Sequence, residues 1–331
     1  MASKTTFSNA ELHMLTRPFG LGALRKCAPI AAGSVETNYL LELDSGKYIL
    51  RYYEGRTMRQ VEYERALLDY LSAHGFPCAP GIVPSDNRVP EYRGKPYMLF
   101  EYVQGEHISS PSPAQAHALI RLIARLNTLT RGLHLPGSES RLTYRPAQML
   151  ELATQRAQQL GTQNARDKLN WYRAALATLE LPHGMEQGVC HCDFYYTNVL
   201  YRDDEITALL DFDDANETWL YFDIVSATDF FRRGFDHETW SDFAPDADII
   251  DLTQAREYLA VFEQICPIPA LDRTHLYDIL KLGILVDCIW YFDRGTLPDF
   301  FEKRKLDALD RLGRDEFNRR LWGADYAGSS H

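Results

Sequence analysis

Three side chains that can bind a cation or accept a proton follow one another in the middle of the sequence. Asp193 precedes Asn198 by five residues, and Asp211 follows after a longer interval. Between Asn198 and Asp211, two short apolar runs at residues 199–201 and 206–210 flank a polar stretch. This pattern predicts a β-hairpin. The hairpin would bring Asn198 and Asp211 to one open end, where an amide oxygen and a carboxylate can share a hard cation. Asp193, at the start of the same loop, is expected to add a third oxygen-bearing group.

Phosphoryl transfer requires this combination of groups. One carboxylate accepts the proton of the attacking hydroxyl, and oxygen ligands hold magnesium against the phosphates of a nucleotide. We therefore predict Asp193 as the catalytic base and Asn198 and Asp211 as metal ligands, with ATP and Mg²⁺ as the cofactors.

The order of these residues is similar to that of a known superfamily. The pattern H-x-D-x-x-x-x-N, here His191 to Asn198, is followed by Asp211-Phe212-Asp213. It resembles the catalytic loop and metal-binding motif of the aminoglycoside phosphotransferase and choline kinase superfamily. The resemblance implies a protein-kinase-like fold and transfer of phosphate from ATP to a hydroxyl. Residues 221–224 resemble a further motif of that superfamily, in which the aspartate, here Asp223, supports the catalytic region.

The first hundred residues add to the resemblance. The run Gly33 to Tyr39 is similar to the nucleotide loop of type II homoserine kinases, which implies that Ser34 and Asn38 contact the nucleotide. The segment containing Glu101 and Val103 looks like the one that joins the lobes of a kinase, whose backbone binds adenine.

Two charged residues match the phosphate-binding part of the same pattern. Arg51 falls where a kinase places its phosphate-contacting lysine, and it interrupts an apolar run. Glu64 falls where the partner glutamate on the following helix is expected, with Glu62 as a competing candidate.

Some positions depart from the kinase pattern. The nucleotide loop has Gly33 but lacks G-x-G-x-x-G, so that this loop alone is a weak signal. Arginine instead of lysine at position 51 keeps the charge but offers a forked donor. Cys192 occupies the position at which protein kinases have an arginine that binds a phosphorylated activation loop. The absence of this arginine favours a small-molecule kinase.

The sequence does not identify the molecule that accepts the phosphate. Homoserine is the first candidate, and choline, ethanolamine, a sugar or an aminoglycoside are alternatives. Phosphorylation of Ser or Thr on proteins is a second hypothesis. A non-catalytic nucleotide-binding module is a third, which the intact Asp193, Asn198 and Asp211 disfavour. Asp229 and Asp287 lie in apolar helical surroundings, where local pairing is the preferred interpretation and binding of a substrate amine is the alternative.

Neighbouring residues of the motif have more than one interpretation. His191 is expected to be a buried orienting residue rather than an acid or a base. Asp213 can bind a second metal or hold the loop in place, and both interpretations stay open. Tyr195 or Tyr196 is expected to face a cleft. Cys190, His191 and Cys192 resemble a metal triplet, but alternate residues of an extended segment point in opposite directions, which disfavours a metal role.

The elements that must position these residues follow from hydrophobic periodicity and capping signals. Ser8 and Glu11 form a capping-box pattern for a short helix that ends near Gly20. Strands are expected at residues 36–43, 47–53, 88–90 and 95–102. Helices are expected at residues 59–73, from 113 onward, and at 146–180, 252–265, 275–292 and 303–322.

The pattern changes from strands to helices at about Gly105. This predicts an α+β, bilobal protein-kinase-like fold, with a small β-rich lobe at residues 1–103 that binds the nucleotide. The large helical lobe at residues 104–331 would hold the catalytic loop and the acceptor site.

Composition sets the wider limits. The chain has 331 residues and a net charge of −11, which argues against a nucleic-acid or anionic-membrane partner. No apolar stretch is long enough for a membrane span, and the N-terminus does not resemble a signal peptide. Six cysteines without a C-x-x-C motif indicate a reduced, cytoplasmic setting. We expect a monomer or a homodimer whose partners are ATP and a small hydroxyl-bearing acceptor.

Overall fold

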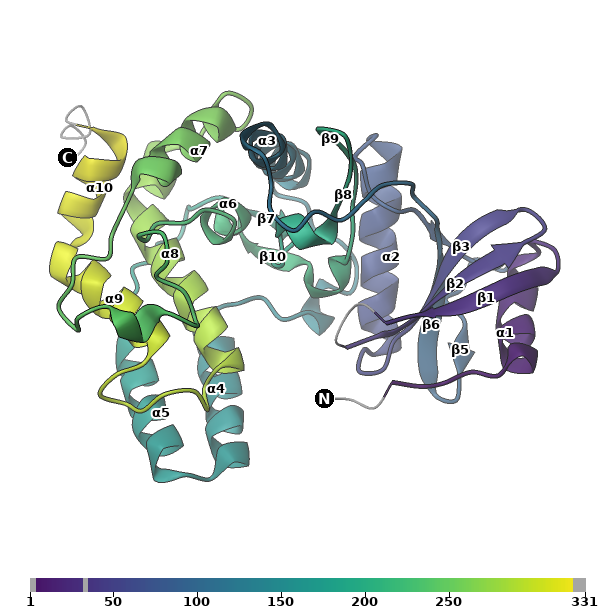
Figure 1. Ribbon diagram of the computed structural model, residues 1–331, viewed down its shortest axis with the longest axis horizontal. Coiled ribbons are helices and arrows are strands. Elements are labelled where there is room, and N and C mark those ends of the chain that lie inside the picture. The colour runs from purple at the N-terminus through teal and green to yellow at the C-terminus, as the bar shows by residue number, and fades with distance from the viewer. Residues whose placement is uncertain (1–3, 32–34, 324–331) are drawn as a thin grey trace. The chain divides into compact units, whose positions relative to one another are not determined.

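The computed structural model describes residues 4–31 and 35–323, and Figure 1 shows its helices and strands. The chain forms two compact units. The first comprises Met1–Ala118, His134–Arg141 and Tyr195–Ala215, and the second comprises Leu119–Leu133, Leu142–Phe194 and Asn216–His331. Strands dominate the first unit and helices the second, which confirms the expected α+β class. Residues 1–103 belong entirely to the first unit, and a lobe boundary after residue 103 stays a prediction.

A six-stranded antiparallel sheet is the centre of the first unit. The strand order is β1-β2-β3-β6-β4, and β5 also pairs with β6. The strands are β1 (Leu24–Ile30), β2 (Thr37–Leu43), β3 (Gly46–Tyr52), β4 (Gly81–Ile82), β5 (Glu91–Tyr92) and β6 (Lys95–Glu101). The expected hairpin between residues 36–43 and 47–53 is confirmed as β2 and β3.

The two faces of this sheet carry different side chains, because successive residues along each strand point to opposite faces. One face carries Leu41, Leu50 and Leu99, which belong to a hydrophobic core that includes residues of α1 (Asn9–Thr16). The other face carries residues such as Ile49 and Arg51, which line a cavity. The strand period therefore separates the core side of the sheet from a candidate binding side.

The helices of the first unit begin where the sequence signals them. Ser8 and Glu11 form the predicted capping box of α1, with the Glu11 carboxylate accepting the Ser8 N–H at 2.8 Å. Thr57 and Gln60 form a second capping box at the start of α2 (Met58–Ala73), which packs against β4 and β6. α2 contributes Glu64 to the cavity, so it covers the sheet face opposite the α1 core.

The hairpin predicted around the catalytic motif is confirmed. β8 (Val199–Arg202) and β9 (Glu205–Leu209) are antiparallel, with Val199 opposite Leu209. Beyond that pair, the Leu210 N–H donates to the Asn198 carbonyl at 2.8 Å. Asn198 and Asp211 therefore lie at the same open end of the hairpin, one residue out of register.

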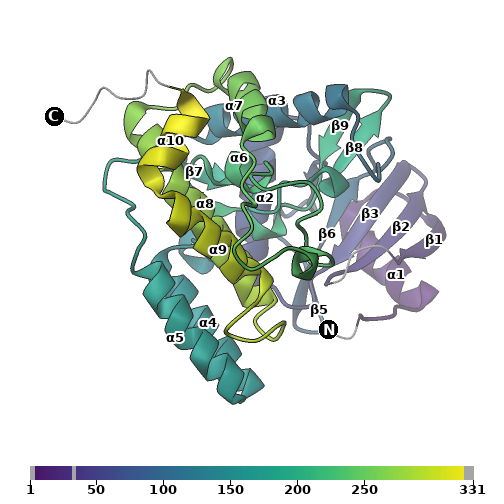
Figure 2. The ribbon, with the colours of Figure 1, turned by 60° about the vertical axis from the view of Figure 1, so that its left-hand side comes forward.

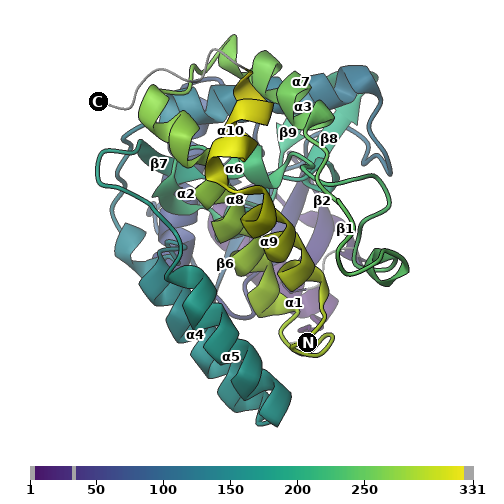
Figure 3. The same cartoon turned by 90° about the vertical axis from the view of Figure 1, so that its left-hand side faces the viewer.

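The second unit consists mainly of helices around a small antiparallel pair of strands, β7 (Gln187–Cys190) and β10 (Asn216–Trp219). Figures 2 and 3 show α4 and α5 as an adjacent pair and α9 beside α8. The helix α3 contributes to both units. The helices are α3 (Pro113–Thr130), α4 (Pro146–Leu160), α5 (Gln163–Leu176), α6 (Phe222–Ser226), α7 (Thr253–Glu263), α8 (Ala270–Trp290), α9 (Phe301–Leu312) and α10 (Arg314–Trp322).

Several expected elements are wrong in detail. The single helix expected at 146–180 is two helices, because Gly161 adopts a left-handed conformation (φ 64°) that ends α4. The helix expected at 303–322 is likewise divided at Gly313. Residues 88–90 are not a strand, and pairing begins only after Pro90, which has no N–H to donate. The sequence reasoning also missed β1.

Within the described residues, none of the helices is both long enough and apolar enough to cross a membrane.

Candidate active site

A cavity of about 720 Å³ lies within the first unit, on the sheet face opposite the α1 core. Part of its wall is apolar and includes Ile30, Ile49, Phe100 and Leu200. The predicted nucleotide and metal residues that the structure describes all line it. They are Asn38, Arg51, Glu64, Glu101, Val103, Asn198 and Asp211. Ser34 lies outside the described residues. An apolar wall with a few convergent polar groups is typical of a small-molecule site.

Arg51 is the centre of the polar end of this cavity. Its Nη1 lies 2.8 Å from Oδ1 of Asp211 and 3.7 Å from Oε1 of Glu64, and its Nε donates to Oδ1 of Asn38 at 3.4 Å. Its guanidinium carbon lies 5.5 Å from the ring centroid of Phe100. Burial works against the charge, but Asp211 and the other acidic groups nearby, Glu64 and Asp213 among them, together outweigh it, so the pKa of Arg51 is raised and the cation persists. A fixed guanidinium of this kind can bind a phosphate oxygen in a forked arrangement.

Glu64, and not Glu62, is the carboxylate beside Arg51. Glu64 is buried, and its Oε2 accepts a hydrogen bond from the Tyr53 hydroxyl at 2.9 Å, whereas Glu62 is exposed. Burial raises the pKa of Glu64 to about 7 despite the nearby Arg51. The carboxyl group is thus in a position to orient the guanidinium from the α2 side.

Asp211 holds an unusual backbone conformation at the end of the hairpin. Its φ of 67° is in the left-handed region, which most residues other than glycine, asparagine and aspartate avoid. Its side chain is about 39% exposed, facing the cavity, so that the carboxylate is accessible to a ligand. A carboxylate offers about four lone-pair positions, and Arg51 uses one oxygen. Together with the amide of Asn198, Asp211 provides the hard oxygen donors that a divalent cation takes.

Two arginines clamp the segment that follows Asp211. Arg56 donates to Oδ2 of Asp213 at 3.0 Å and to Oδ1 of Asp214 at 2.7 Å. The buried Arg141 donates to the carbonyls of residues 212, 213 and 215 and reaches that of Gln60 on α2. Burial, with the adjacent Asp211, raises the pKa of Asp213. The Arg56 contact supports the interpretation of Asp213 as the residue that holds the loop.

Neither arginine was found from the sequence. Arg141 lies 71 to 74 positions before the carbonyls of residues 212, 213 and 215, in an irregular segment without periodicity, and no spacing motif marks such a contact. Arg56 lies directly before Thr57, the N-cap of α2. The polar residues around Arg56 are those of an ordinary turn.

Asp193 belongs to the second unit, in the loop after β7. The buried carboxylate of Asp223 fixes this loop, because it accepts the backbone N–H of His191 at 2.7 Å and of Cys192 at 2.8 Å. This confirms the supporting position expected for Asp223. Burial raises the pKa of Asp223, and the two N–H donors oppose that rise.

His191 is fully buried, as expected for an orienting residue. Its Nδ1 accepts the Asp193 N–H at 3.3 Å, and its ring contacts Phe194 edge-on. Cys192 has a φ of 66° and its Sγ accepts a hydrogen bond from Asn216 at 3.0 Å. These contacts fix the conformation of the backbone around Asp193. The side chain of Asp193 is exposed.

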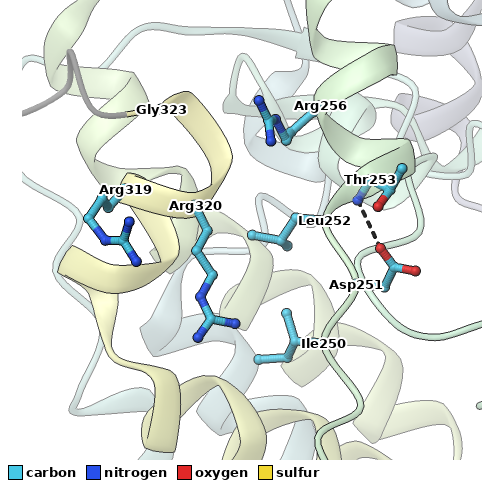
Figure 4. Close-up of a pocket in the computed structure, with 8 residues that line it drawn as sticks. All are labelled: Ile250, Asp251, Leu252, Thr253, Arg256, Arg319, Arg320 and Gly323. Atoms are coloured by element: carbon cyan, nitrogen blue, oxygen red, sulfur yellow. Dashed lines mark hydrogen bonds between the residues drawn. The ribbon is translucent and has the colours of Figure 1, made fainter.

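A second cavity, of about 460 Å³, lies in the second unit between α7 and α10 (Figure 4). Figure 4 shows Arg256 on one side and Arg319 and Arg320 on the other. The last two donate to the carboxylate of Glu316, and Asp251 accepts the Thr253 N–H at 3.0 Å. This cavity contains none of the predicted site residues, so the chemistry is concentrated elsewhere.

Comparison with known proteins decides the family. The sequence model of the phosphotransferase enzyme family matches residues 26–261. This range contains the motif residues of both units. The chain belongs to the phosphotransferase enzyme family. This match confirms the superfamily resemblance drawn from the catalytic-loop motif.

Two relatives of this phosphotransferase are named for the same activity. A homoserine kinase from Xanthobacter autotrophicus is 26% identical over 343 residues, covering 98% of this chain and 99% of that protein. A homoserine kinase from Pseudomonas aeruginosa is 26% identical over 291 residues, covering 86% and 85%. The family and these full-length relatives indicate that the phosphotransferase is a kinase acting on a hydroxyl.

Solved structures agree on the fold. The amicoumacin kinase hAmiN, in complex with AMP-PNP, Ca²⁺ and Ami, has a TM-score of 0.62 at 16% identity, covering 95% of this chain and 94% of that one. A microcompartment-associated aminopropanol kinase has a TM-score of 0.55 at 16% identity, covering 96% and 99%. These neighbours confirm the protein-kinase-like fold, with a β-rich N-terminal part and a helical C-terminal part.

Gly105 of this phosphotransferase is a position where a side chain would disturb the cavity wall. A Cβ there would lie 2.6 Å from Oγ1 of Thr207 and 2.8 Å from Cβ of Leu200, which also lines the cavity. We expect Gly105→Ala to lower the free energy of unfolding by about 1–3 kcal/mol through overpacking, and to weaken nucleotide binding. Thermal unfolding and a nucleotide titration measure the two effects. Gly55→Ala is the control, since a Cβ at Gly55 meets no atom within 4 Å. Equal stability of the two variants would contradict the prediction.

Proposed function

We propose that this kinase transfers the γ-phosphate of ATP, in a magnesium-dependent reaction, to the hydroxyl of a homoserine-like amino alcohol. The observation that carries the proposal is the cavity of the first unit, where an apolar wall leads to Asn38, Arg51, Asn198 and Asp211. The homoserine kinase relatives, which match 86% and 98% of the chain, support homoserine as the acceptor. The nucleotide and Ca²⁺ in the complex of the amicoumacin kinase support the use of a nucleotide with a divalent cation.

The apolar part of the cavity suits a purine. The backbone N–H groups of Glu101 and Tyr102 already donate to the carbonyls of Pro80 and Lys47. We therefore assign the adenine hydrogen bond to the N–H of Val103, which follows them along the same wall. Phe100 and Ile49 would contact the faces of the base.

The polar part suits the phosphates. Arg51 would bind phosphate oxygens, and Glu64 and Asn38 would keep its guanidinium oriented. Asn198 and Asp211 would hold Mg²⁺, which neutralises charge on the phosphates when it is bound. The donor set fits this cation, because both residues offer hard oxygen atoms on one hairpin end.

Asp193 is assigned the role of base. Its carboxylate would accept the proton of the acceptor hydroxyl while the hydroxyl oxygen bonds to the γ-phosphorus and ADP leaves. The backbone hydrogen bonds to Asp223 would hold the loop of Asp193 in place during this step. The buried His191, whose Nδ1 accepts the Asp193 N–H, would keep the same loop from shifting.

The proposal predicts magnesium-dependent release of ADP that requires a small hydroxyl-bearing acceptor. The assay would compare homoserine, choline, ethanolamine, an aminoglycoside and a Ser/Thr-rich protein, each with and without Mg²⁺. We expect homoserine to give the highest kcat/KM. Phosphate appearing only on the protein would contradict a small-molecule kinase, and a lack of magnesium-dependent nucleotide binding in a thermal-shift titration would contradict the kinase mechanism.

A further inference from the structure

The second unit gathers charged side chains near Asp193 that the proposed mechanism does not use. Asp229 follows α6, Asp287 lies on α8, and Lys305 lies on α9. The carboxyl of Asp287 interacts electrostatically with both Lys305 and Asp193, and Lys305 also interacts with Asp229. α8 and α9 pack side by side, as Figures 2 and 3 show. These groups therefore form one cluster of mixed charge, which interacts with the predicted base through Asp287.

Lys305 is a cation held on aromatic rings. Its Nζ lies 4.3 Å from the ring centroid of Phe301 and 4.8 Å from that of Phe231. Among the described residues, Lys305 has no hydrogen-bond partner and no carboxylate oxygen within ion-pair distance. Lys303, two positions earlier on α9, is instead paired with Asp307 at 2.5 Å. Burial lowers the pKa of Lys305, while the carboxylates of Asp287, Asp229 and Glu302 oppose that effect.

The other groups near Lys305 do not neutralise it by direct contact. One oxygen of Asp229 accepts the Phe231 N–H at 3.0 Å, so this carboxylate is used in the local backbone. His237 packs on Phe301 with ring centroids 4.1 Å apart. Burial, with a smaller effect of Lys305, lowers the pKa of His237 to about 4, and the ring adds no charge at neutral pH. Glu302, like Asp229 and Asp287, acts on Lys305 without forming an ion pair with it. An anionic group of a ligand would give this ammonium a direct partner.

Asp287 is the complementary anion. It is exposed to solvent on α8, whereas its helix neighbours Val286 and Cys288 are buried. The surrounding protein reduces its hydration and raises its pKa to about 6, with Asp193 adding a smaller rise. A carboxylate that is accessible yet poorly hydrated gains more from an ammonium ion than one in bulk water does.

We propose that Asp287 and Lys305 select a zwitterionic acceptor, with Asp287 binding its ammonium group and Lys305 binding its carboxylate. The inference rests on the proposed function, because it assumes that Asp193 receives the proton of the acceptor hydroxyl. An acceptor with only one of the two charges leaves Asp287 or Lys305 without a partner, which costs binding free energy. A polycationic acceptor is repelled by Lys305. The cluster therefore favours an amino acid that bears a hydroxyl over amino alcohols, sugars and aminoglycosides.

The test compares three acceptors by ADP release in the presence of Mg²⁺ and ATP. Homoserine carries both charges, aminopropanol is homoserine without its carboxylate, and the hydroxybutyrate with a terminal hydroxyl is homoserine without its ammonium. We expect the wild-type kcat/KM for homoserine to exceed both others by roughly ten- to a hundred-fold. Lys305→Met should lower the homoserine-to-aminopropanol ratio at least ten-fold, mainly through the KM for homoserine, and Lys305→Arg should restore part of it. Asp287→Asn should lower the homoserine-to-hydroxybutyrate ratio in the same way.

The controls separate selection from folding and from the proposed function. Lys303→Met, on the same helix, should leave both ratios unchanged. Ratios are insensitive to a general loss of folded protein, and Lys305→Arg keeps the charge if Lys305→Met is unstable. Equal use of homoserine and aminopropanol by the wild type, or an unchanged ratio in Lys305→Met, would overturn the inference while leaving the proposed function intact. ADP release with none of the three acceptors would instead overturn the proposed function.

Discussion

Asp193→Asn is expected to lower kcat by about 10²–10⁴, because an amide cannot accept the proton of the acceptor hydroxyl. The loop should keep its conformation, since Asp223 binds the N–H groups of His191 and Cys192 and these bonds do not involve the Asp193 side chain. Nucleotide affinity should also persist, because Asp193 is not among the residues that line the cavity of the first unit. Steady-state ADP release and a separate nucleotide titration measure these two properties.

The matched control for this variant is Asp204→Asn. Asp204 is an exposed residue in the turn of the β8–β9 hairpin, so the same chemical change should leave turnover and nucleotide binding close to those of the wild type. A near-normal kcat in Asp193→Asn would remove Asp193 as the base. Parallel loss of nucleotide affinity would show that the substitution acts through the fold rather than through proton transfer.

The parts of the site that the sequence predicts well are those set by local patterns. The apolar runs on either side of residues 202–205 require the β8–β9 hairpin, and the hairpin alone brings Asn198 and Asp211 to one end. The alternation in β3 places Arg51 opposite the core residues Leu50 and Tyr52. In both cases neighbours along the chain determine the direction of the side chain.

Contacts between distant segments are not encoded in such patterns. Arg141 supports the Asp213 carbonyl from a segment that lies far away in the sequence, and no periodicity marks it. Periodicity does not reveal that the ammonium of Lys305 rests on Phe231 and Phe301 either, because that contact depends on how α9 packs. The sequence draws attention to Asp287 as a polar residue in apolar surroundings, but only the packing shows its cationic neighbour.

The residues at which helices end are also difficult to predict from the sequence. The hydrophobic pattern of residues 146–180 continues across Gly161, yet the left-handed conformation of this glycine ends α4. Glycine permits such a conformation at little cost but does not require it, so the sequence leaves both outcomes possible. The tertiary packing of α4 and α5 against each other decides between them.

Asp211→Asn is expected to lower kcat/KM by about 10²–10³, through loss of a charged ligand and the transition-state stabilisation that depends on it. Asparagine is the informative substitution, because it tolerates the left-handed φ of 67° at this position, whereas alanine would add backbone strain. The amide oxygen can still accept a hydrogen bond from Arg51, so the cavity should keep its shape. The diagnostic result is a nucleotide titration in which added Mg²⁺ no longer increases affinity.

Asp203→Asn is a matched control, since Asp203 also has a left-handed conformation (φ 54°) on the same hairpin but lies at its turn. Asp213→Asn tests the alternative that Asp213 binds a metal. Because Arg56 binds Asp213, this variant should loosen the segment and weaken nucleotide binding with and without Mg²⁺ alike. If instead Asp213→Asn removed the response to Mg²⁺ and Asp211→Asn kept it, the metal site would be formed by Asp213, and the clamp by Arg56 would be a feature of the metal-free state.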